Sequence, residues 1–414
     1  MVVPRIAVVG GGVSACSIAY GLRDHISANK LSLHLFEMGR APGGRATTRG
    51  TRERPELRVD HGAPAFAAHT PRFESLCESM VAANALEKVG PPLAFGTLKA
   101  DNSFELEDAA AAPTRYVATN GQGLGALCEA LLRGGSAAAS PVQVNFSTMV
   151  GKVEASTTDA GATQWTLSSN KGVPLGSYDF LVITSTGLAH PRWRTTFGGE
   201  PPLVEAAAAL GDATLGAALS SLAPLTSKPV TACLLAYEAS AAVAWAALPF
   251  YKARIEDDDI LSRVVVQRIS PTLTAVVLHS THAFSRGSAH VYGATSTAAR
   301  LAGAASDKEQ EQQVLETMLS AAAKRLGAML GESAAASVSS PAWGPHLHRW
   351  GAAFPDAPLL PEAQALIPSA SVAFSGDYVD GGDGQAGSVE GAALSGLKTA
   401  EALVTVLGLG AAPS

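Results

Sequence analysis

The stretch Ile6-Ala7-Val8-Val9-Gly10-Gly11-Gly12-Val13-Ser14-Ala15 opens the chain's first predicted regular structure. A β-branched run stops at three glycines, a helical pattern follows over residues 17–22, and a second apolar run over residues 31–36 ends at Glu37. The order is strand, glycine turn, helix, strand and acid. This order is typical of a dinucleotide-binding βαβ unit.

Each small residue of this G-x-G-x-x-A pattern has a physical role. Gly10 permits the tight turn, Gly12 lets the backbone approach a pyrophosphate, and Ala15 lets the helix pack closely on the strand. With Ser14 they form the predicted phosphate contact, because the N–H groups and the positive dipole end of the helix attract negative charge. Glu37 is placed to accept hydrogen bonds from a ribose diol. An ordinary glycine turn would not require the second strand and the acid.

An arginine-rich segment over residues 38–60 follows the acid. Its Gly43-Gly44-Arg45 sequence lets the backbone pass close to a ligand, and the Arg45 guanidinium can then donate hydrogen bonds to ligand oxygens. Most of the other arginines are interleaved with acids and are interpreted as a solvated loop. The predicted contacts from this segment are therefore Gly44 and Arg45.

Composition limits the classes of protein that are possible. The chain has 414 residues, 47% hydrophobic and 16% charged, with a formal net charge of −6. The length predicts about two or three domains, and the acidic balance gives no electrostatic basis for binding nucleic acid. Four widely spaced cysteines show no metal spacing and are interpreted as buried thiols in a reducing compartment. The histidines lack a third ligand nearby, so no metal site is predicted.

No targeting or membrane segment is predicted. The first strand begins close to Met1, which leaves no room for a signal or transit peptide in this sequence. No run of about 18 apolar residues occurs, so no transmembrane segment is expected. The expected location is the cytoplasm, or an organelle if a transit peptide has been removed.

Several segments together resemble the flavin amine oxidase superfamily and, within it, the renalase-like proteins. The resemblance covers both ends of the chain well and the middle poorly. It implies FAD bound across two domains, with the isoalloxazine at their junction. No cysteine lies within residues 377–389 to form a thioether, so the FAD is expected to be non-covalent. The segments are Glu37 with Gly43-Gly44-Arg45, Asp60-His61-Gly62-Ala63, Pro71-Arg72-Phe73, His348-Arg349-Trp350, Gly376-Asp377 and Val389-Glu390-Gly391-Ala392.

The resemblance places His61, Gly62 and Ala63 near the flavin, although a histidine in a packed turn such as His61 is more commonly a hydrogen-bonded structural residue. The C-terminal order of strand, carboxylate, glycine loop and helix suits a flavin as well. After Gly376, Asp377 can accept a ribityl hydroxyl. The Val389 N–H, at the helix start, can stabilise negative charge on the reduced ring.

The adenine contact is expected from a later hairpin. In flavoproteins of this architecture, the strand that begins near Val150 places a backbone group on the adenine. The alternative is that Val150 is a plain core valine.

These observations predict an α/β fold: a Rossmann-type FAD-binding domain with a parallel sheet, discontinuous in sequence, and an inserted α+β substrate-binding domain. The FAD-binding domain is predicted at residues 1–75, 114–190 and 343–414, and the substrate-binding domain at residues 76–113 and 191–342. Residues 73–88 are predicted to be helical. Ser306-x-x-Glu309 is predicted to begin a long helix as a capping box.

The resemblance implies hydride transfer from a small-molecule substrate to FAD, followed by reoxidation by O2 to give H2O2. In renalase-like proteins the substrates are isomeric dihydronicotinamide dinucleotides, which are oxidised to NAD(P)+. This chain departs from the superfamily at Pro64-Ala65, and its candidate strand over residues 261–268 has no lysine. The alternatives are a flavin amine oxidase or other small-molecule oxidase, and a catalytically silent FAD-binding assembly or interaction protein. No catalytic residue is assigned.

Overall fold

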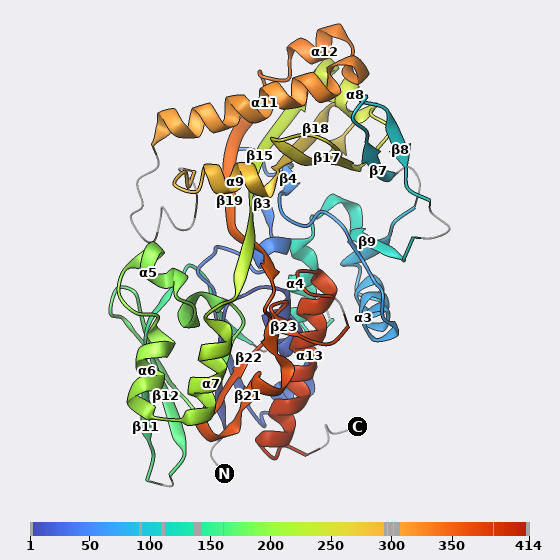
Figure 1. The fold of residues 1–414 in the computed structure, drawn as a ribbon. Helices are drawn as coiled ribbons and strands as arrows, with labels where there is room; N and C mark the ends of the chain where they lie inside the picture. Colours follow the sequence, from blue (N-terminus) through green and yellow to red (C-terminus); the bar gives the residue numbers. More distant parts are fainter. Residues whose placement is uncertain are drawn as a thin grey trace.

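The computed structural model describes residues 3–90, 93–108, 112–135, 142–159, 161–293, 296, 301, 307–383 and 385–410. Two main sheets organise the chain, one in the lower half of Figure 1 and one in the upper half. We call the two parts the lower half and the upper half. None of the described helices is both long and apolar enough to cross a membrane.

The lower half is built on a six-stranded sheet with the order β10-β2-β1-β14-β22-β21, in which every pair except β21 with β22 is parallel. Strands such as Ile6–Val9 are continuously apolar because both faces of the sheet are covered. The predicted α/β fold, with a parallel Rossmann-type sheet assembled from separate parts of the chain, is confirmed. The strands are β1 (Arg5–Val9), β2 (Ser32–Phe36), β10 (Gln143–Asn145), β14 (Phe180–Ile183), β21 (Leu366–Ile367) and β22 (Val372–Phe374).

Helices cover one face of this sheet, where Ile6 and Val8 enter a common core with them. A three-stranded antiparallel sheet and two further helices cover the other face, where Ala7 and Val9 are buried. The first set comprises α1 (Val13–Gly21), α3 (Pro71–Ala82), α4 (Gly125–Leu132) and α13 (Val389–Val406). The second comprises β11 (Val150–Thr157), β12 (Thr163–Ser169), β13 (Pro174–Tyr178), α6 (Pro202–Leu210) and α7 (Ala213–Leu222).

The position of α6 and α7 differs from the sequence expectation. Residues 191–222 were assigned to the substrate-binding domain, yet Leu203 and Leu215 pack in the core of the lower half with Trp165. α5 (Arg192–Phe197) lies next to them in Figure 1. The other domain boundaries stay a prediction.

The upper half is a seven-stranded mixed sheet with the order β19-β15-β18-β17-β16-β7-β8. One face is covered by α8 (Ala239–Ala246) and α11 (Lys308–Leu330), whose apolar side chains form its core. The opposite face packs on short segments that lie outside both main sheets, including Leu57 and Val117. The strands are β7 (Phe95–Leu98), β8 (Phe104–Leu106), β15 (Thr226–Glu238), β16 (Lys252–Ile255), β17 (Leu261–Ser270), β18 (Leu273–Ser280) and β19 (Trp343–Asp356).

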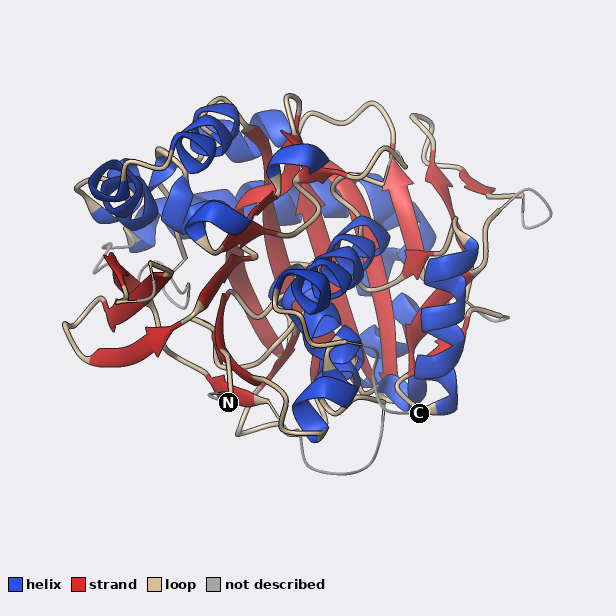
Figure 2. Cartoon of the chain, turned by 90° about the horizontal axis from the view of Figure 1, so that it is seen from below, coloured by secondary structure: helices blue, strands red, loops and turns tan. Residues whose placement is uncertain are grey.

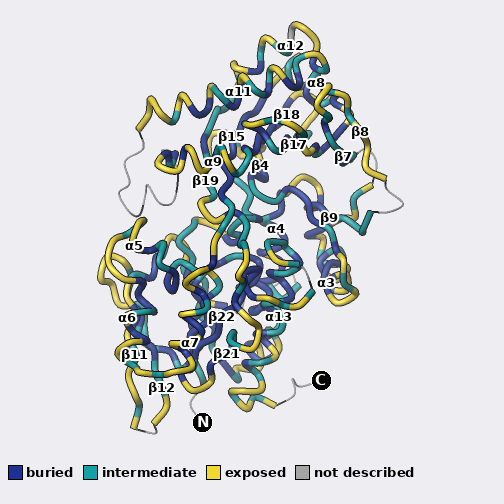
Figure 3. The backbone as a smooth tube through the Cα atoms, viewed as in Figure 1, coloured by how far each residue is buried: buried dark blue, intermediate teal, exposed yellow. Residues whose placement is uncertain are grey.

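Short elements complete the chain within the two halves and between them. Figure 2 views the chain from below, and Figure 3 shows burial concentrated in the two sheets, with exposed residues along α11 and at the tip of the β11–β12 hairpin. These elements are α2 (Arg23–Ser27), α9 (His282–Gly287), α12 (Glu332–Ala336), β3 (Thr48–Gly50), β4 (Arg58–Asp60), β5 (Phe66–Ala67), β6 (Leu86–Lys88), β9 (Arg115–Ala118), β20 (Leu360–Pro361) and β23 (Val379–Asp380).

Two local predictions need correction or qualification. The helix predicted over residues 73–88 ends at Ala82, and Leu86–Lys88 is instead strand β6, paired with β9. Asn84 has a φ of 56°, a left-handed conformation that a helix cannot continue through. Ser306 lies outside the described residues. The N-cap of α11 is Asp307, whose carboxylate accepts from the Glu309 and Gln310 N–H groups.

Candidate functional site

The glycine turn after β1 forms one end of a large cavity. Gly10 has a φ of 111°, and a side chain there would collide with Thr184 Oγ1, so the turn requires glycine. Helix α1 begins after Gly12 without a side-chain cap and without an acid in its first turn. A Cβ at Gly12 would meet nothing within 4 Å. The first N–H groups of α1 therefore remain available to an anionic ligand.

Glu37 lies at the end of β2, next to this turn. Its carboxylate accepts hydrogen bonds from Gly11 N at 2.6 Å and Gly39 N at 2.5 Å. Burial raises the pKa of Glu37, while these two bonds act in the opposite direction. The carboxylate thus stabilises the glycine turn and also lines the cavity, as a ribose-binding acid would.

Arg45 and Asp377 form a two-pronged ion pair in the cavity wall. The two guanidinium nitrogens lie 2.6 Å from the two carboxylate oxygens, and Arg45 also donates to Ala353 O at 2.7 Å. Asp377 is 4% exposed. Such a bidentate pair is more rigid than a single ion contact. The structure therefore joins two residues that the sequence predicted as separate ligand contacts.

The Asp60-His61-Gly62-Ala63 segment passes close to Arg45. Ala63 N donates to Arg45 O at 2.9 Å, and a side chain at Gly62 would collide with that same oxygen. Asp60 is buried and accepts from Thr48 Oγ1 and Leu124 N, and burial raises its pKa to about 6. This close backbone approach is the reason that the segment needs glycine.

His61 belongs to an aromatic cluster at the cavity. Its ring stacks on Trp350 with centroids 5.3 Å apart and meets the edge of His348 at 4.6 Å. Burial, together with nearby Arg49, lowers the pKa of His61 to about 4. Its Nδ1 has no hydrogen-bond partner within the described part of the chain. The imidazole is therefore neutral, with a nitrogen free to accept or donate one bond.

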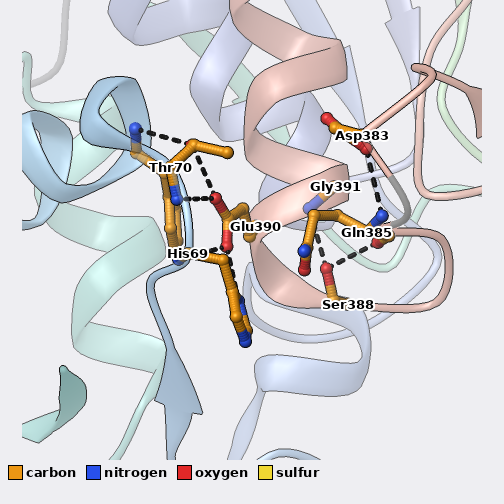
Figure 4. Close-up of polar contacts among 8 residues, drawn as sticks. His69, Thr70, Asp383, Gln385, Ser388, Glu390 and Gly391 are labelled. Carbon is orange, nitrogen blue, oxygen red and sulfur yellow. Dashed lines mark hydrogen bonds and ion pairs between the residues drawn. The ribbon is translucent and has the colours of Figure 1, made fainter. Parts of the chain in front are cut away.

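The N-terminus of α13 reaches the cavity from the C-terminal part of the chain. Figure 4 shows its N-cap: Ser388 Oγ accepts from Gly391 N at 2.9 Å and donates to Gln385 O at 2.6 Å. Glu390, 1% exposed, accepts from the backbone and side chain of both His69 and Thr70, at 2.6 to 2.9 Å. Glu390 thereby joins the starts of α3 and α13. Val389, the first residue of α13, lines the cavity.

A single continuous cavity of about 2440 Å³ is lined by thirteen of the fourteen predicted cofactor residues. The one exception among the predicted cofactor residues is Ala15, which is buried in α1, where it packs in the core as its predicted role requires. The lining residues from the prediction are Gly10, Gly12, Ser14, Glu37, Gly44, Arg45, His61, Gly62, Ala63, Val150, Gly376, Asp377 and Val389.

The opposite wall of the cavity comes from the upper sheet, and the sequence did not predict which side chains of that sheet line it. Lys252 of β16, Arg263 of β17 and His279 of β18 all line it. The candidate strand over residues 261–268 indeed contains no lysine, but the neighbouring strand supplies one. Alternation of Lys252 and Arg254 with buried Ala253 and Ile255 was the only available signal. No group of three histidine, cysteine or acidic residues suitable for a metal occurs among the described residues.

Comparisons with known proteins agree with this fold. Residues 8–80 match the family model described as NAD(P)-binding Rossmann-like domain. No curated protein matches the chain. A solved structure assigned as a protoporphyrinogen oxidase from Exiguobacterium sp. 255-15 is similar, with a TM-score of 0.58 and 12% identity over 97% of this chain and 99% of that one. A putrescine oxidase bound to putrescine is similar over the same shares, with a TM-score of 0.57 and 11% identity. These likenesses show a shared fold.

Proposed function

We propose that this protein is an FAD-dependent oxidoreductase in which cofactor and substrate occupy the central cavity together. The observation that carries the proposal is the convergence of the predicted cofactor residues, from both ends of the chain, on one cavity. Its volume of about 2440 Å³ exceeds the roughly 300 to 1,000 Å³ of an ordinary ligand pocket. The description of both similar structures as oxidases supports the same reaction class.

The residues on the cavity wall fit FAD. The uncapped start of α1, with Gly12 and Ser14, would hold the pyrophosphate, and Glu37 would hold the ribose. Val150 would contact the adenine. The segments at residues 44–45, 61–63, 376–377 and 389 would hold the rest of the molecule. Bound FAD supplies a two-electron acceptor for hydride.

The protein's own side chains would orient the substrate. Arg45 and Asp377 fix each other, so that this part of the wall stays rigid. His61 and His348 stay neutral because burial lowers the pKa of both. The unpaired Nδ1 of the neutral His61 would then accept a hydrogen bond from the substrate without adding a positive charge beside it.

The substrate that we propose is an isomeric dihydronicotinamide dinucleotide, as in the renalase-like proteins that the chain resembles. The overall reaction would take the dihydronicotinamide, O2 and one proton to NAD(P)+ and H2O2. A flavin amine oxidase or other small-molecule oxidase remains the second candidate, since the similar putrescine oxidase has the same fold.

Anaerobic reduction of the flavin tests the reaction and the substrate together. We expect 2- and 6-dihydro isomers of NADH to bleach the flavin quickly and ordinary 4-dihydro NADH to bleach it slowly, because the reacting carbon must be held close to the flavin. Putrescine and benzylamine should have no effect. Rapid bleaching by an amine alone would favour the amine oxidase. If light reduces the bound flavin but none of the candidate substrates does, the result would favour the catalytically silent FAD-binding protein.

The cofactor itself is tested by denaturation. We expect the purified protein to be yellow and to release intact FAD on acid precipitation, because no cysteine lies in residues 377–389 to attach the ring. Flavin that stays with the precipitate would contradict a non-covalent cofactor. A colourless protein that takes up no added FAD would contradict the proposed function.

A further inference from the structure

One face of the upper sheet carries basic side chains in register. Arg263 pairs with His279 across β17 and β18, His279 with Ala232 across β18 and β15, and Ala232 with His348 across β15 and β19. Directly paired residues project from the same face of a sheet. Three basic groups therefore lie in one row across four strands, and all three line the cavity.

Lys252 belongs to the next row on the same face. It pairs with Val265 of β17, which is two residues from Arg263, and side chains two residues apart in a strand share a face. Arg263 and Lys252 are both partly exposed, and both line the cavity. We call Arg263, Lys252 and His279 the basic cluster.

Neither Arg263 nor Lys252 has a counter-ion in the described part of the chain. The charged groups that act on Lys252 are Arg263, Arg115 and Glu107, and the only acid among them already pairs with Arg115 at 2.6 Å. Burial and the two arginines lower the pKa of Lys252 to about 7, and burial lowers that of Arg263. His279 Nε2 donates a hydrogen bond to His61 O at 2.9 Å, and burial lowers the pKa of His279.

This arrangement is costly unless something neutralises it. Buried charges are normally paired, and like charges close together raise the cost of each. The whole cavity shares the imbalance: twelve lysine and arginine residues line it, against three described carboxylates, in a chain with a net charge of −6. Glu37 and Asp377, two of those carboxylates, are already engaged by backbone N–H groups and by Arg45.

We propose that Arg263 and Lys252 bind an anionic group, carboxylate or phosphate, of the substrate. The proposal rests on the proposed function for the identity of the partner cofactor, and it specifies the substrate further. The phosphates of FAD have their own site at the start of α1, so the basic cluster serves the second ligand. A substrate that carries only ammonium groups would be repelled.

Four ligands of similar shape test this proposal in the purified holoprotein: benzoate, phenyl phosphate, benzyl alcohol and benzylamine. Binding is measured by calorimetry and by perturbation of the visible flavin spectrum. We expect at least one of the two anions to bind, with the tighter one identifying the anionic group, and neither of the others to bind. Benzylamine binding as tightly as the anions, or no binding by either anion, would overturn the proposal.

Variants assign the anion to these residues. Lys252→Met and Arg263→Gln should each weaken anion binding at least tenfold, and Lys252→Arg should restore most of the affinity because it keeps the charge. Lys152→Met removes an exposed lysine of β11 that pairs with Glu154, and it should change the affinity less than twofold. Equal affinity in wild type and Arg263→Gln would contradict the assignment. A Lys252→Arg variant that is folded, as judged by circular dichroism, but does not bind the anion would also contradict the assignment.

The two proposals can fail separately. Calorimetry does not require flavin. Anion binding by a protein that takes up no FAD would therefore support the anion site and contradict the proposed FAD-dependent function. A protein that holds photoreducible flavin but binds neither anion would support the proposed cofactor and contradict the anion site.

Discussion

Lys252 destabilises the protein that it serves. Its pKa is lowered to about 7 in the folded chain, against about 10.4 in the unfolded chain. Below pH 7 both states carry the charge and the cost is fully present. As pH rises from 7 to 10, the folded state loses its proton first, so wild-type stability rises. This cost is the one that a bound anion would relieve.

We therefore expect Lys252→Met to be more stable than wild type by about 1 to 3 kcal/mol at pH 6, a range that allows for partial exposure of the side chain. The difference should shrink toward pH 10. Urea unfolding at four pH values measures it, with Lys152→Met as the control that leaves stability nearly unchanged. A variant less stable than wild type at pH 6 would show that the ammonium group is well accommodated.

Site residues that lie next to a glycine turn or at the end of an apolar strand could be predicted from the sequence. Site residues without such a local pattern around them could not. Glu37 directly ends an apolar run, and Asp377 follows one after Ser375-Gly376, so the end of the strand fixes the place of each carboxylate. Lys252 begins a strand of only four residues, too short for its alternation to be recognised. Its partner Arg263 is apparent only from the register of β17 with its neighbours.

At the scale of elements, α1 and α13 pack closely against each other beside the glycine turn. A side chain at Gly396 of α13 would collide with Ser14 O and come within 2.8 Å of Ser17 Cβ. We expect Gly396→Ala to lower the free energy of unfolding by about 1 to 3 kcal/mol and to weaken FAD binding by moving α1. Gly216→Ala, in α7 with open space around it, should instead add up to about 1 kcal/mol. Chemical unfolding and flavin titration measure both; equal effects would contradict the close crossing.

Two contacts join α3 to α13, and they should differ greatly in strength. Glu390 is buried and accepts four hydrogen bonds, so Glu390→Ala should cost about 2 to 4 kcal/mol and loosen the flavin site. Arg72 pairs with Glu401 between the same helices, at 2.6 Å but in solvent. Glu401→Ala should therefore cost less than about 1 kcal/mol. Thermal unfolding and the flavin dissociation constant compare them, and similar losses would show that burial is not decisive here.

Long periodic elements were predictable and short connections were not. The β1 to β2 unit and α13 have apolar runs or stripes that local sequence fully specifies. Residues 86–88 were predicted as the end of a helix, and only their pairing with β9 makes them a strand. The packing of α6 and α7 on the lower half is a tertiary choice that their own apolar stripes do not encode.

At the scale of the molecule, one cavity has walls from both halves, so its ligand should couple them. We expect FAD at about 100 times its dissociation constant to add about 2.7 kcal/mol to the stability of the apoprotein. Calorimetry should show two separate unfolding transitions without FAD and one with it. Trp165 lies in the core of the lower half and Trp245 in the core of the upper half. Replacing one of them with Phe leaves the fluorescence of the other to follow the unfolding of its own half. Two transitions that persist at saturating FAD would contradict the coupling.

The discontinuous sheet also sets an order of events during synthesis. β1 and β14 emerge early from the ribosome, but β22, which pairs with β14, and α13, which packs on α1, emerge last. Until residues 372–406 are made, the nascent chain exposes an unpaired edge of the sheet and the apolar side of α1. The upper sheet gains its final strand, β19, just before that. The lower half therefore starts first and finishes last, and we expect a nascent chain stalled near residue 370 to bind chaperones but not FAD.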